Sequence, residues 1–167
     1  LVTRGLRSRR LVDILGAVAV AAAVPVKLGR DDSLDAALSA ALARASGFVE
    51  APPPGLTASQ GAAMLACLGN CFAAFWRVNG KAANLERATR IYALALDSCS
   101  GPEMRLARAM IQNHLAAVHE ARAALDADPV HLEEAAKAYH AAAGAIDPAE
   151  HPSDWAFAQT RLGMGLY

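Results

Sequence analysis

The residues best suited to chemistry in this chain are three cysteines and five histidines. Cys67 and Cys71 stand four residues apart, so on a helix they would share one face and offer two thiolates to a metal. A structural zinc site needs four ligands, and no further cysteine or histidine lies near this pair in the sequence. We therefore expect both thiols to be small buried hydrophobic side chains, and we assign no metal.

The histidines occupy separate segments and lack the H-E-x-x-H spacing that would set two metal ligands and a base on one helix face. We expect them to be independent of one another, with His119 as a partly buried packing residue. A general base needs a partner within hydrogen-bond reach, and Cys99 has no base beside it in the sequence. The sequence thus predicts no enzyme, no catalytic residue and no cofactor. The five histidines are His114, His119, His131, His140 and His151.

The composition favours helices and excludes some classes of partner. Hydrophobic residues make up 54% of the chain, mainly Ala and Leu, while aromatic residues make up only 5%. Lysine plus arginine equals aspartate plus glutamate at 16 each, so no net charge attracts nucleic acid or an anionic membrane surface. The odd number of cysteines, without a C-x-x-C pair, is typical of a reducing compartment. We therefore expect a cytoplasmic, all-α protein.

A pair formed by Leu and a small residue recurs along the chain at a fixed distance. Leu68-Gly69, Leu115-Ala116 and Leu162-Gly163 follow one another at 47 residues, each inside an apolar segment of helical period. Tyr92 and Tyr139 are also 47 residues apart. One period that fits two motifs indicates an internal repeat.

Each repeat unit is expected to hold two helices. The first carries the Leu-small pair, where Gly or Ala lets another helix approach closely. The second opens at Leu85-Glu86-Arg87-Ala88, which returns 47 residues later as Leu132-Glu133-Glu134-Ala135. Asn79-Gly80 and Asp128-Pro129 interrupt the pattern between the two helices, with Asp128 expected at the N-cap and Pro129 at the first helical position.

The same pattern extends towards the amino terminus in a weaker form. Leu15-Gly16 stands where the Leu-small pair is expected, and Leu34-Asp35-Ala36-Ala37 resembles the opening of a second helix. We therefore expect one helical-repeat domain of about seven helices over residues 1–167. Its units are a degenerate pair in 1–50, a second pair in 51–101, a third pair in 102–152 and the start of a fourth pair in 153–167.

These motifs resemble the tetratricopeptide repeat. The resemblance lies in the Leu-Gly pair, the Leu-Glu-x-Ala opening of the second helix, and its Tyr92 and Ala95, although the family's usual period is about 34 residues. It covers residues 11–167, most clearly from residue 57 onward. It implies a right-handed superhelix of antiparallel helix pairs, an α-solenoid, whose function is to bind a peptide or protein partner.

The longer period resembles a bacterial type of array found before caspase-like CHAT domains. Leu68-Gly69-Asn70, Phe75-Trp76-Arg77 with Gly80, and the joint at 151–156 carry this resemblance. It implies an alternative function, in which the array regulates an effector such as a CHAT-type peptidase outside this chain. The chain carries no protease motif of its own, so that activity is not transferred to it.

The amino-terminal residues allow two interpretations. Four arginines between residues 4 and 10 precede an apolar run at 11–24, an order typical of a secretory or twin-arginine signal segment within residues 1–26. Against this, Asp13 interrupts the run, and 14 residues are fewer than the ~20 that span a bilayer. We favour a first repeat helix, with export as the alternative.

The first helices of stacked pairs commonly line the concave side of the stack. In each first helix, we expect three residues to pack against the neighbouring helices: the Leu, the small residue after it and the residue four positions after the Leu. The residues at positions −5, −2, +2 and +5, counted from that Leu, form a second stripe on the same helix. That stripe is apolar and weakly polar and suits a helix or an extended peptide; without Lys or Arg, it is not expected to hold a carboxylate. Contact with a second copy, or with the rest of a longer chain, stays an alternative. The expected partner-binding residues are Asn70, Met110, Asn113, Glu120, Phe157, Thr160 and Met164.

Overall fold

The computed structural model describes residues 32–50 and 54–165, and all regular structure in these ranges is helical. The expected all-α fold is therefore confirmed for this part of the chain. The expected helix over 11–24, its signal-segment alternative and the end of the last helix lie outside the described residues. The helices are α2 (Asp32–Glu50), α3 (Ala58–Asn79), α4 (Ala82–Asp97), the short 3-10 helix η1 (Pro102–Met104), α5 (Arg105–Asp126), α6 (Pro129–Ala145) and α7 (Pro152–Gly165).

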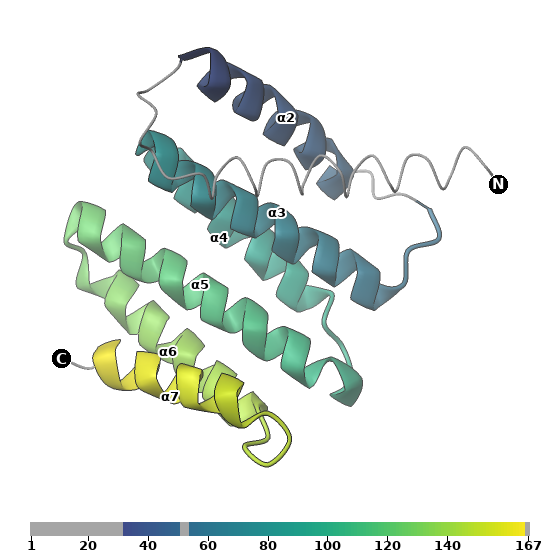
Figure 1. The fold of residues 1–167 in the computed structure, drawn as a ribbon, viewed down its shortest axis with the longest axis vertical. Coiled ribbons are helices and arrows are strands. Elements are labelled where there is room, and N and C mark those ends of the chain that lie inside the picture. The colour runs from purple at the N-terminus through teal and green to yellow at the C-terminus, as the bar shows by residue number, and fades with distance from the viewer. Residues whose placement is uncertain (1–31, 51–53, 166–167) are drawn as a thin grey trace.

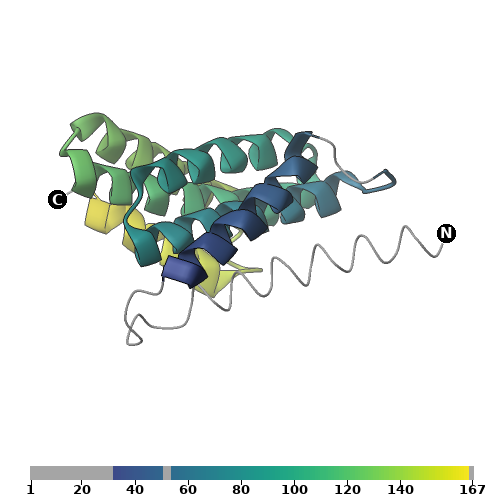
Figure 2. The same cartoon turned by 90° about the horizontal axis from the view of Figure 1, so that it is seen from above.

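The helices form two layers. Figure 1 shows α3, α5 and α7 side by side in front, with α4 and α6 behind them. Consecutive helices from α3 onward are antiparallel neighbours, and α5 contacts both α4 and α6. Figure 2, seen from above, shows α2 running obliquely to α3 and α4. The front layer thus consists of the first helices of the second, third and fourth expected units, and we call its outer surface the first-helix face.

The helix ends follow from local sequence. Thr57 closes a capping box on α3, because its hydroxyl accepts a hydrogen bond from the backbone N–H of Gln60 and the Gln60 side chain accepts one from the Thr57 N–H. Gly80 ends α3 at a φ of +69°, a conformation that glycine adopts without steric cost. Asp128 caps α6 through the Val130 N–H and Pro129 opens the helix, so the expectations for both residues are confirmed.

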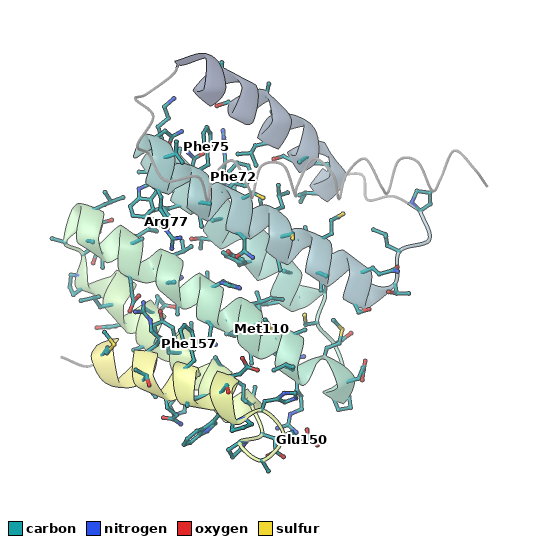
Figure 3. The ribbon with its side chains drawn as sticks, viewed as in Figure 1. Phe72, Phe75, Arg77, Met110, Glu150 and Phe157 are labelled. Atoms are coloured by element: carbon teal, nitrogen blue, oxygen red, sulfur yellow. The ribbon has the colours of Figure 1, made fainter. Side chains whose placement is uncertain are left out.

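The largest part of the core lies around α3 and α4. Figure 3 shows Phe72 and Phe75 on the side of α3 that faces α2, and both are buried together with Leu68. Burying a side chain of this size contributes about 1.5–3 kcal/mol. Two smaller clusters, built mainly of alanines, join α5 to α6 and α7. The array therefore has its bulkiest core at the α3–α4 pair.

Burial follows the 47-residue spacing at several positions. Tyr92 and Tyr139 are each 1% exposed, and Ala95 and Ala142 are each 0% exposed. The opening leucines differ, because Leu85 is 1% exposed and Leu132 is 48% exposed. Leu85 belongs to the large core around α3 and α4, whereas Leu132 belongs to none of the buried clusters among the described residues. The period therefore identifies equivalent positions, although their surroundings differ.

Candidate partner-binding face

The contact between α5 and α7 is a polar cluster around a buried tyrosine. The Tyr139 hydroxyl donates to Glu120 Oε2 at 3.1 Å, and Arg161 Nε donates to the Tyr139 oxygen at 3.0 Å. Arg161 also pairs with the Glu120 carboxylate, and its guanidinium lies 5.5 Å from the centre of the Tyr139 ring. Glu120, expected to bind a partner, is thus held by Tyr139 of α6 and Arg161 of α7.

The contact between α3 and α5 is built around the equivalent tyrosine. The Tyr92 hydroxyl donates to Asn70 Oδ1 at 2.5 Å, and the His114 ring stacks on Tyr92 with centroids 6.1 Å apart. A Cβ added at Gly69 would lie 2.6 Å from Tyr92 Cε1, so this glycine lets the ring pass directly beneath α3. Burial raises the pKa of Tyr92, which keeps its hydroxyl a neutral donor.

A groove of about 380 Å³ opens between α3 and α5 above Tyr92. We call it the α3–α5 groove. Asn70, Ala73 and Ala117 of the expected second stripe lie along it. A volume of this size accommodates one or two side chains of a bound peptide. The complete lining is Asn70, Ala73, Ala74, Trp76, Arg77, Leu85, Tyr92, His114, Ala117, Val118 and Ala121.

Most of the other expected partner-binding residues are exposed on α5 and α7. Met110 is 48% exposed, Phe157 56% and Met164 64%; Figure 3 labels the first two. Thr160 is exposed, and its hydroxyl bonds to the Ala156 carbonyl of its own helix. Asn113 is half-buried, and its Oδ1 has no hydrogen-bond partner among the described residues.

Apart from Asn70, the polar and aromatic side chains that line the groove were not predicted from the sequence; these are Trp76, Arg77, Tyr92 and His114. Arg77, labelled in Figure 3, lies near the C-terminal end of α3. It follows Ala73 by four residues, so extending the expected stripe by one helical turn would have found it. His114 and Tyr92 become neighbours only through the packing of α5 on α4.

The histidines are not all independent, which corrects the sequence-based expectation. The His119 and His131 rings lie 5.8 Å apart, because the antiparallel α5–α6 pair brings them together. His131 Nε2 also approaches Asp126 Oδ2 at 3.3 Å. Burial, with His131 beside it, lowers the pKa of His119, whose partial burial is confirmed. No group of three or more potential metal ligands occurs among the described residues.

The cysteines do not share one environment. Cys71 and Cys99 are buried, but Cys67 is exposed, so the expectation that Cys67 is buried is wrong. The core side of α3 is occupied by Leu68, Cys71 and Phe72, and position 67 faces outward. Burial raises the pKa of Cys71 to about 11, so at neutral pH it is an uncharged thiol that packs rather than a nucleophile.

One described helix, α3, is long and apolar enough to cross a membrane by length and composition. Part of it is buried inside the molecule, and core helices of soluble proteins pass the same test, so this is weak evidence for a membrane span. Comparison with protein-family models, with curated proteins and with solved structures finds no match to the chain.

Proposed function

We propose that this chain is a tetratricopeptide-like protein-binding module, a right-handed superhelix of helix pairs that binds a peptide or protein through its first-helix face. One observation carries the proposal. Met110 and Phe157, 47 residues apart, are exposed at 48% and 56% on successive first helices. Large apolar side chains left exposed at a repeated position favour a partner that covers them. Met adapts to partners of varied shape, and aromatic side chains are frequent anchors of interfaces.

The proposal is tested by selecting binders for the immobilised chain from a displayed library of random peptides. We expect the selected peptides to bind the double variant Met110→Glu/Phe157→Glu about tenfold more weakly or worse, since covering two unpaired charges costs more than ~1.4 kcal/mol. Helical circular dichroism should stay unchanged, because both side chains are half-exposed.

The matched control is Leu132→Glu/Val130→Glu on α6, where the two side chains are 48% and 53% exposed. This variant places the same charges at similar exposure behind the first-helix face and should bind the peptides as the unmodified chain does. The proposal fails if no peptide is enriched, or if the two double variants bind equally.

A further inference from the structure

We propose that the α3–α5 groove receives a carboxylate, the side chain of an aspartate or glutamate on the partner. This inference rests on the proposed function, since it names the chemistry of a partner bound to the first-helix face. It also revises the expectation that this surface does not suit a carboxylate. That expectation considered only the second stripe, whereas the groove is also lined by Arg77 and His114, which do not belong to that stripe.

The groove is lined with hydrogen-bond donors. Arg77 is exposed and forms no ion pair within the part of the chain that the structure describes. The Asn70 Oδ1 already accepts a hydrogen bond from Tyr92, so Asn70 has its Nδ2 hydrogens left to donate. Trp76 has a buried indole N–H with no partner among the described residues. His114 also lines the groove, and a neutral imidazole carries one N–H donor.

No aspartate or glutamate is among the residues that line the groove. A cavity that holds a guanidinium and several N–H donors, with no carboxylate to match them, is complementary to an anion. The walls between the donors are Ala73, Ala117 and Val118, which leave room without adding polar groups. The groove therefore carries a positive charge and hydrogen-bond donors that a negatively charged group on a partner would match.

The repeat itself indicates which anion fits. Adding 47 to the residue numbers takes Tyr92 to Tyr139 and His114 to Arg161. The same shift takes Ala73 to Glu120, whose carboxylate binds the Tyr139 hydroxyl and Arg161. At the α5–α7 contact the chain thus supplies its own carboxylate, whereas at the α3–α5 contact Ala73 supplies none and the Tyr92 hydroxyl donates to the amide of Asn70 instead. The equivalent contact argues for a carboxylate rather than a phosphate.

A partner-free test puts the missing carboxylate on the chain. We compare Ala73→Glu with Ala73→Gln, which has nearly the same shape and no charge, and follow the titration of His114 by NMR. We expect Ala73→Glu to raise the pKa of His114 by about one unit through the nearby negative charge, and Ala73→Gln to leave it unchanged. An unchanged His114 in Ala73→Glu would overturn the proposal, as would an equal rise in Ala73→Gln.

A second test adds the carboxylate from solution to the unmodified chain. The probes are a capped Ala-Glu-Ala peptide, the matching Ala-Gln-Ala peptide and inorganic phosphate, and the signals are the His114 ring and the Trp76 indole N–H. We expect saturable shifts with the glutamate peptide alone, reduced at least about tenfold in affinity by Arg77→Gln. An equal response to glutamine or to phosphate would overturn the proposal, as would no response to glutamate.

These results separate the inference from the proposed function. Library peptides that bind the first-helix face, together with an unchanged His114 in Ala73→Glu, would leave the proposed function standing and remove the inference. A raised pKa of His114 and binding of the glutamate peptide, without any enriched library peptide, would keep the carboxylate site and remove the peptide-binding function.

Discussion

At the scale of single residues, the two equivalent tyrosines show how one position is used in two ways. The Tyr92 hydroxyl is held by a neutral amide, Asn70, whereas the Tyr139 hydroxyl lies between Glu120 and Arg161. Both rings are buried at 1% exposure, so each hydroxyl needs a partner to offset its loss of water. An ion pair within the chain therefore completes the contact between α5 and α7. The contact between α3 and α5 has no such ion pair, and we expect an anion from a partner to bind there.

Gly69→Ala should destabilise the protein by about 1 kcal/mol. Helix propensity alone favours alanine by 0.5–1 kcal/mol, but overpacking a core typically costs about 1–3 kcal/mol. Here the new Cβ would lie 2.6 Å from Tyr92 Cε1. Urea unfolding measures the difference. The matched control is Gly163→Ala, the same repeat position in α7, where a Cβ meets nothing within 4 Å. It should stabilise the protein slightly, and equal effects of the two changes would contradict the steric explanation.

At the scale of helices, the two hairpins differ at equivalent N-caps. Lys81 and Asp128 are 47 residues apart and begin α4 and α6 with similar backbone angles, φ −78° and ψ 110° compared with φ −81° and ψ 115°. Asp128 caps its helix through the Val130 N–H, whereas Lys81 makes no side-chain cap hydrogen bond. The backbone of α4 is thus arranged for a cap that its sequence does not supply.

Lys81→Asp should stabilise the protein by about 0.5–1 kcal/mol, because the new carboxylate can accept a hydrogen bond from the first turn of α4. Asp128→Ala should cost about 1 kcal/mol, because it leaves a backbone N–H of α6 without its side-chain acceptor. Lys81→Ala is the control and should change the midpoint of urea unfolding little. A loss of stability in Lys81→Asp would show that the two N-caps are not equivalent.

At the scale of the whole molecule, burial of imidazole rings couples stability to pH. Partial burial of the ring lowers the pKa of His114, although the residue as a whole is exposed. Burial, together with the neighbouring His131 and Arg122, lowers the pKa of His119, while Glu134 acts against this shift. A histidine whose pKa is lowered by folding binds protons more readily in the unfolded state. Acidification through the ordinary histidine range therefore favours unfolding.

We expect the free energy of unfolding to fall as the pH decreases below about 6.5, the unfolded-state pKa of histidine, before the carboxylates titrate. Urea unfolding at a series of pH values measures this slope. His119→Gln should flatten it, because the variant has no proton to gain on unfolding at that position. His140→Gln removes an exposed histidine of α6 and should keep the slope of the unmodified chain. An equal slope in His119→Gln would show that this ring does not couple folding to pH.

The sequence by itself determined the helical class, the 47-residue equivalences and the helix ends at Asn79-Gly80 and Asp128-Pro129. These features depend on local physics: helix propensity, capping and the backbone freedom of glycine act within a few residues. The exposure of Met110 and Phe157 also followed from helical spacing.

Only the tertiary structure decided which equivalent residues meet. The ion pair between Glu120 and Arg161, the contact of His119 with His131 and the stacking of His114 on Tyr92 join separate helices. Such contacts depend on how helices cross and rotate against each other, and small changes in packing alter both. A repeat in the sequence predicts that two residues occupy equivalent positions in the fold. The side chains around each position determine whether its binding partner comes from the chain itself or from another molecule.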